Sequence, residues 1–161
     1  MTELARYLRT HVAGANAGED LFERGARELP EPAAAIVGRI HREILDEKAV
    51  LERIIEDNDY SENVLSNVVA KVGEKASRLK PSSVGPRTAM TDFVDLETMR
   101  VALSGKLAGF EALVAIADAE PSVDRLEFEQ LVQQARRQLD EVCELHRKAA
   151  PAGLLGRPTP R

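Results

Sequence analysis

The stretch IHREILDEKAVLERII, residues 40–55, decides the fold of this chain. Alternating steps of four and three residues connect Ile40, Ile44, Glu47, Leu51 and Ile54, which is the spacing of one buried face of an α-helix. Four of these five side chains are apolar, and the fifth is a carboxylate. Because an isolated charge is costly to bury, we expect Glu47 to find a partner inside the protein. The stretch therefore predicts a long helix in a bundle whose core contains a polar layer.

Three further segments carry the same periodicity. Short turns rich in proline, serine and acidic residues separate the first segment from the second and the third from the fourth. Residues 3–28, capped by Thr2, are expected to form the first helix, and residues 32–57 the second. Residues 92–118, capped by Thr91, are expected to form the third helix. The fourth is expected to begin after a cap at Ser122 and to continue to about 150. Short connections within each pair predict two antiparallel hairpins.

The connection between the two pairs is long and contains an amphipathic segment of its own, residues 61–79. At about 1.5 Å per residue, such a helix spans nearly 30 Å, which is enough to return along the bundle. The third helix would then run parallel to the second. We therefore expect one all-α domain over residues 1–150, with a crossover helix at about 61–79. Residues 151–161, rich in proline and glycine, are expected to form a flexible tail.

The amino-acid composition indicates what kind of protein this chain forms. With 161 residues, 43% of them hydrophobic and 30% charged, the chain is expected to be globular, and its aromatic content of 4% predicts an aliphatic core. A net charge of −5 disfavours binding to nucleic acid. Cys143 is the only cysteine, so a disulfide framework is excluded and the cytoplasm is the expected compartment. No apolar run reaches the ~18 residues of a membrane span.

Three stretches carry a resemblance to a known family: YLRTHVAGANAGEDLFERGAREL at 7–29, the stretch at 40–55, and LSGKLAGFEALVAIA at 103–117. Together with the expected arrangement of two hairpins joined by a crossover helix, these stretches resemble the ferritin-like superfamily. The chain is similar in particular to small uncharacterised bacterial four-helix-bundle proteins. The resemblance covers about residues 3–150. It implies a ferritin-like bundle. In well-studied members, two Glu and two Glu-x-x-His motifs bind two iron or manganese ions, and the proteins store iron or reduce oxygen and peroxide.

The ligand pattern of those metal proteins is incomplete in this chain, because it contains no Glu-x-x-His motif. The candidates that remain for a divalent metal site are three carboxylates, Glu19, Glu43 and Glu47, together with the imidazole of His11. Iron or manganese bound by these residues would make the chain a metal–carboxylate protein with oxidase or peroxide-handling activity. That is one of two functional interpretations.

The other interpretation is that a network of side chains takes the place of a metal site. Counting residues from the turns places Lys106, Gln134 and Gln138 at about the height of Glu47. Those side chains would satisfy the buried carboxylate, and a lysine ammonium would repel a metal ion. We therefore expect no catalytic residue and no resident cofactor, and favour a non-enzymatic structural or interaction module. Its partner would be a protein, including itself as a homodimer.

Five glycines lie inside the expected helices: Gly14, Gly18, Gly25, Gly105 and Gly109. A glycine in a helix costs about 0.5–1 kcal/mol relative to alanine, so we expect each to have a structural reason. Close packing of two helices is the favoured reason, and space for a ligand or for a partner's side chain is the alternative.

Overall fold

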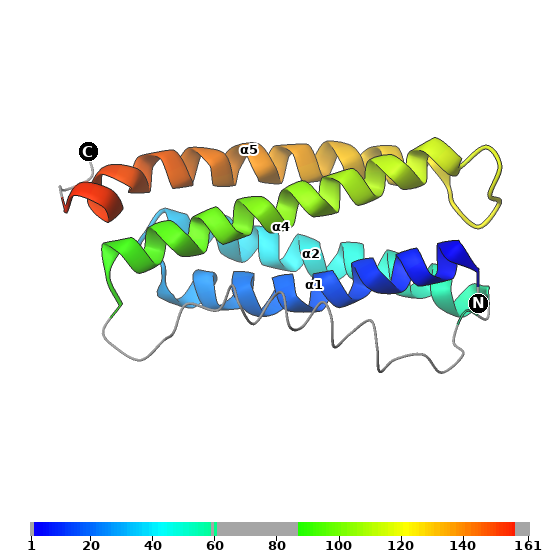
Figure 1. Cartoon of the computed structure of the whole chain (residues 1–161), viewed down its shortest axis with the longest axis horizontal. Helices are drawn as coiled ribbons and strands as arrows, with labels where there is room; N and C mark the ends of the chain where they lie inside the picture. The colour runs from blue at the N-terminus through cyan, green and yellow to red at the C-terminus, as the bar shows by residue number, and fades with distance from the viewer. Residues whose placement is uncertain (1, 59, 61–86, 157–161) are drawn as a thin grey trace.

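The computed structural model describes residues 2–58, 60 and 87–156. Within these ranges the chain forms four helices and no strand, α1 (Glu3–Glu28), α2 (Ala33–Asp57), α4 (Ala89–Ile116) and α5 (Arg125–Leu155) (Figure 1). The all-α class predicted from the sequence is confirmed. The helix expected at 61–79 lies outside the described residues.

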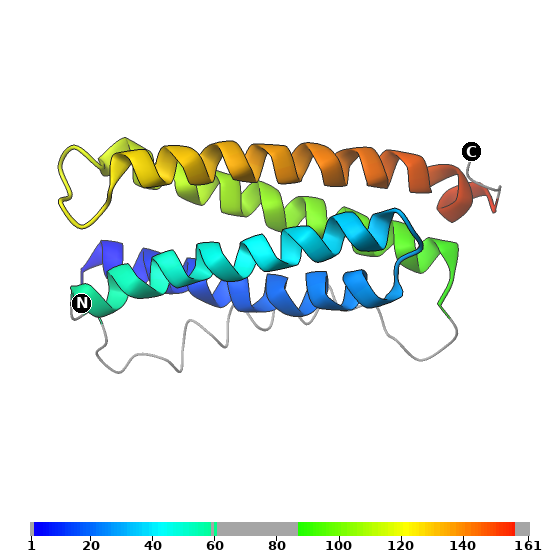
Figure 2. The same ribbon diagram turned by 180° about the vertical axis from the view of Figure 1, so that it is seen from behind.

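The four helices form two hairpins that lie against each other. Helices α1 and α2 are antiparallel, as are α4 and α5, and α4 runs in the same direction as α2 (Figures 1 and 2). Between the hairpins, α1 packs beside α4 and α2 packs beside α5. Helices α2 and α4 are therefore diagonal neighbours, and only side chains that cross the core can connect them.

Thr2 caps α1 as predicted, with its hydroxyl accepting a hydrogen bond from the Ala5 amide at 3.1 Å. The cap expected at Thr91 for the third helix is wrong, because α4 begins at Ala89 with Thr88 as its N-cap. The Thr88 hydroxyl accepts from the Thr91 amide at 3.2 Å, and the Thr91 hydroxyl accepts from the Thr88 amide at 3.4 Å. Either threonine suits a cap by residue type, and this reciprocal pairing selects the first.

Both ends of the fourth helix differ from expectation. Asp124 caps α5 in place of Ser122, whose hydroxyl instead donates to Glu120 at 2.7 Å. Helix α5 then continues through Pro151 to Leu155, so residues 151–155 are helical where a flexible tail was expected. Pro151 lies one turn from the end and removes only one hydrogen bond there. Residues 157–161 lie outside the described residues.

Two apolar clusters build the core, and a polar layer lies between them. One cluster, toward the turn between α1 and α2, includes Phe22, Ile40, Leu96, Met99 and Val142. The other, toward the opposite end, includes Leu8, Leu51, Phe110, Phe128 and Val132. On α2, α4 and α5 the side chains between the clusters are polar: Glu47, Lys106 and Gln138. The candidate site of this protein is that layer.

Candidate functional site

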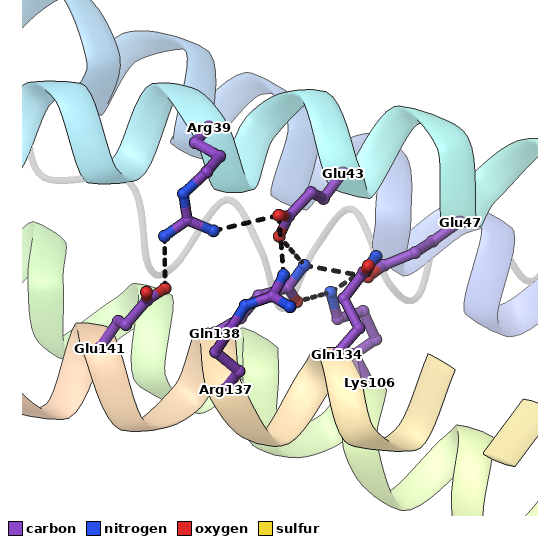
Figure 3. A network of polar contacts seen from close by, with 8 residues as sticks. All are labelled: Arg39, Glu43, Glu47, Lys106, Gln134, Arg137, Gln138 and Glu141. Carbon is purple, nitrogen blue, oxygen red and sulfur yellow. Dashed lines mark hydrogen bonds and ion pairs between the residues drawn. The ribbon is translucent and has the colours of Figure 1, made fainter. Parts of the chain in front are cut away.

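The carboxylate of Glu47 is the centre of the polar layer, with a side chain that is only 2% exposed. Lys106 of α4 donates to one of its oxygens, and Gln134 and Gln138 of α5 donate to the other, at 2.8 and 3.0 Å (Figure 3). These bonds join three helices through one buried group. Because each carboxylate oxygen has a donor, the burial of Glu47 is compensated.

Lys106 crosses the core from α4 to reach Glu47 on the diagonal helix α2. Its ammonium also donates to the side-chain oxygen of Gln138, so it lies between two oxygen atoms (Figure 3). Burial lowers the pKa of Lys106, while the neighbouring charge of Glu47 acts in the opposite direction. The four-carbon stem lets the ammonium span the distance between diagonal helices. It is the cation of the layer.

A second carboxylate, Glu43, extends the layer toward the outer side of α2 and α5. It accepts from Arg39 at 3.0 Å, from Arg137 at 2.7 Å and from Gln138 at 2.8 Å (Figure 3). Arg39 also donates to Glu141 at 2.6 Å. The amide nitrogen of fully buried Gln138 therefore connects Glu43 to Glu47. The result is a continuous charge-compensated network.

The sequence-derived candidates separate into two groups in the structure. Glu43, Glu47, Lys106, Gln134 and Gln138 lie together in the layer. Their ion-pair partners Arg39 and Arg137 are missed by periodicity, which assigns such positions to solvent. The signal available in the sequence is the spacing of Arg39 from Glu43, since residues four apart face each other on a helix.

The remaining candidates, Glu19 and His11, lie elsewhere. Glu19 pairs with Lys48 at 2.6 Å. The ring of His11 is tilted against that of Tyr7, with ring centroids 4.6 Å apart, and it lies against Gly109. Burial lowers the pKa of His11, which favours the neutral imidazole. The four proposed metal ligands are therefore not gathered around one point.

The side chains present do not fit a di-metal site. Each candidate carboxylate already contacts a cationic side chain: Glu19 contacts Lys48, Glu43 contacts Arg39 and Arg137, and Glu47 contacts Lys106. Among the described residues, no group of three or more His, Cys, Asp or Glu side chains could hold a metal ion. A divalent ion at Glu47 would have to displace the ammonium or share its oxygens at a repulsive distance.

A second buried carboxylate, Asp95 of α4, is absent from every sequence pattern considered above. Its side chain is 1% exposed and accepts from Arg24 of α1 at 3.2 Å and from Arg87 at 3.1 Å. Arg87 also pairs with Glu28 at 2.7 Å and with Asp92 at 2.6 Å. This cluster connects the C-terminal end of α1 to the N-terminal end of α4. Each of its charged side chains is paired with another within the fold.

Comparison of the chain with protein-family models, with curated proteins and with solved structures finds no match. No helix in the described part of the chain is long and apolar enough to cross a membrane.

The free energy of unfolding at acidic pH is expected to depend on the ionisation of Glu43. Burial alone would raise the pKa of Glu43, but the hydrogen bond from Gln138 and the charges of Arg39 and Arg137 together lower it. A lowered folded-state pKa contributes stability that is present above the unfolded pKa and is lost as pH falls through the folded pKa. Glu43→Gln should therefore be less stable than the wild type at pH 7, by about 1 kcal/mol.

That difference should shrink as the pH falls below 4.5, the ordinary value for this carboxyl. Urea unfolding at pH 7, 5, 4 and 3 measures it. Glu129→Gln is the control, because Glu129 is exposed on α5 and pairs with Arg125 at 3.7 Å. A constant difference between wild type and Glu43→Gln across this range would show that the charge of Glu43 is not what stabilises the layer.

Proposed function

We propose that this chain is a non-enzymatic, ferritin-like helical module of the cytoplasm that acts through contacts with protein, including a second copy of itself. The proposal includes a crossover helix at about 61–79, in the segment outside the described residues. One observation carries it: the ammonium of Lys106 lies between Glu47 and Gln138, where a metal–carboxylate protein would need its metal ion.

The buried carboxylates of the layer are compensated by cationic side chains. Glu47 is nearly inaccessible to solvent, and Lys106 supplies the positive charge that its carboxylate requires. Glu43 is likewise compensated by two arginines. A divalent ion would add two positive charges to a layer that has no uncompensated carboxylate. The layer thus supports a structural role and leaves no oxygen ligand free for redox chemistry.

Substitution of Lys106 tests this role of the ammonium. Lys106→Met removes the cation and leaves Glu43, Glu47 and the Gln138 oxygen around the vacated position. Added Mn²⁺ should then raise the melting temperature of Lys106→Met by a few degrees, because a bound ion stabilises the folded state. Wild-type protein should show no such rise, and neither should Lys48→Met, which removes the partner of Glu19 instead.

Elemental analysis of wild-type protein purified without chelator completes the experiment. About one or two metal ions per chain, lost on Glu47→Ala, would contradict the proposal. It would instead favour the alternative of an iron or manganese carboxylate protein with oxidase or peroxide-handling activity. Glu19 and Glu43 would then be the next residues to substitute.

The outer face of α4 supports a protein partner. Its exposed positions are mostly small or apolar and follow a heptad-like spacing: Val94, Val101, Gly105, Ala108, Ala112 and Ala115. Val101, the largest exposed side chain near the middle of this face, is 62% exposed. A helix with apolar residues on both its inner and outer faces is typical of one covered on both sides. A second copy of α4, related by a twofold axis, presents the matching surface.

Sedimentation equilibrium of the full chain tests this interface. Wild-type protein is expected to be a dimer at micromolar concentration, and Val101→Glu is expected to be a monomer because it buries a charge in the interface. Leu126→Glu is the matched control, because Leu126 is 64% exposed on α5 and lies off the α4 face. A monomeric wild type, or a dimer unaffected by Val101→Glu, would exclude this surface.

A further inference from the structure

A cavity of about 310 Å³ lies between α1 and α4, with α2 behind it. Its walls are mostly apolar and include Phe22, Ile44, Leu51, Leu103 and Phe110. Lys106 and Glu47 of the polar layer also line it, so the cavity reaches the ion pair that joins α4 to α2. Val101 and Gly105, which belong to the outer face of α4 proposed as a dimer surface, line it as well.

The glycines explain how the cavity is shaped. At one end the ring of His11 lies so close to Gly109 that no side chain would fit there, and at the other Met99 approaches Gly25 in the same way. Between these ends, a Cβ atom added at Gly14, Gly18 or Gly105 would meet no atom within 4 Å. The helices therefore meet closely at both ends and leave the middle open. Of the two reasons expected for these glycines, close packing applies to the first pair and open space to the other three.

The polar atoms at the back of the cavity limit what it can hold. An ammonium has three N–H donors, and contacts with Glu47 and Gln138 account for two of those of Lys106. The charge of Lys106 is already compensated by Glu47, so a second anion in the cavity would bury an uncompensated negative charge. The lowered pKa of His11 keeps that wall uncharged near pH 7.

We propose that this cavity binds a neutral, mainly apolar small molecule with one hydrogen-bond acceptor, such as a ketone, which accepts from the third N–H of Lys106. A water molecule takes about 30 Å³ of liquid volume, so the space suits a ligand of about ten non-hydrogen atoms. Mostly apolar walls with a small number of polar groups are the usual composition of a small-molecule site, and here the polar groups belong to Thr10, His11, Glu47, Lys48 and Lys106. This inference does not depend on the proposed function, because it requires neither a protein partner nor the absence of metal binding.

Three probes of similar chain length test which kind of ligand the cavity binds: 2-octanone, octane and octanoate. In thermal unfolding of the full chain, saturating 2-octanone is expected to raise the melting temperature by about 3 °C. Octane should raise it less because it lacks the acceptor, and octanoate least because it brings a charge. An equal or larger effect of octanoate would overturn the assignment of a neutral ligand, and no effect of any probe would overturn the site.

Two variants of α1 test whether 2-octanone binds in this cavity. Gly18→Leu places a side chain in the open middle of the cavity and should abolish the effect of 2-octanone without lowering stability, since leucine favours helix over glycine. Asn16→Leu is the matched control, because Asn16 is exposed and does not line the cavity. Equal responses of the two variants to 2-octanone would place the binding elsewhere.

The role of Lys106 is tested in the double variant Glu47→Leu/Lys106→Met, which removes both charges together and so leaves neither buried alone. It should bind 2-octanone and octane equally. A preserved preference for 2-octanone in this variant would show that Lys106 is not the anchor.

Discussion

Replacing Lys106 alone with methionine is expected to lower the free energy of unfolding by about 3–5 kcal/mol. The side chain of Glu47 is 2% exposed, so the variant leaves a carboxylate in the core without its cation. Gln134 and Gln138 still donate to it, but two amide groups do not supply a compensating charge. Urea unfolding of wild type and variant at pH 7 measures the difference.

A double-mutant cycle separates the loss of a partner from the value of the pair. Glu47→Leu/Lys106→Met should recover most of the lost stability and come within about 1 kcal/mol of the wild type, because an apolar pair needs no desolvation of charge. Lys48→Met is the control for loss of a lysine that pairs nearer the surface, with an expected cost below about 1 kcal/mol. If Lys106→Met and Lys48→Met lost equal stability, the layer would not be the buried charge centre described here.

Replacing Arg87 with leucine is expected to cost about 2–4 kcal/mol. Arg87 pairs with three carboxylates, and one of them, Asp95, is 1% exposed. After the substitution Asp95 keeps its pair with Arg24 of α1, at 3.2 Å, but Glu28 near the end of α1 loses its pair with Arg87 at the start of α4. Urea unfolding measures the loss, and hydrogen exchange in the first turns of α4 should increase with it.

Arg125→Leu is the matched control, because Arg125 also pairs with two carboxylates, Asp118 and Glu129, but at the surface. Its expected cost is below about 1 kcal/mol. Adding Asp95→Leu to Arg87→Leu should restore part of the stability, since the buried charge is then removed as well. No restoration would mean that Arg87 acts through Glu28 and Asp92 rather than through Asp95.

Much of the secondary structure could be predicted because helix periodicity and capping are local properties. Alternating steps of three and four residues identify the inward face of each helix, and they place Glu47 on it. Thr2 and the proline-rich turn before α2 mark boundaries that the structure reproduces closely. Prediction was less accurate where several residues of suitable type lie near one helix end. Thr88 and Thr91 compete for one cap, and Ser122 and Asp124 compete for the other.

The candidate site was predictable only in part, and the glycines show why. Gly14 and Gly25 look alike in the sequence, yet one faces open space and the other lies against Met99. That difference depends on how far apart α1 and α4 lie at each height, which no local pattern contains.

The sequence by itself determined that this chain folds into helices, where α1 and α2 begin and end, and that a carboxylate faces inward at Glu47. Counting residues along the helices also placed Lys106 at the height of Glu47, but only the tertiary structure decided which cations meet Glu19 and Glu43. Lys106 compensates Glu47 across the diagonal of the bundle, Lys48 takes Glu19, and Arg39 and Arg137 take Glu43. The physical reason is that helical periodicity arises within one segment. Charge pairing depends on the rotation and separation of different helices and on how far each side chain reaches between them.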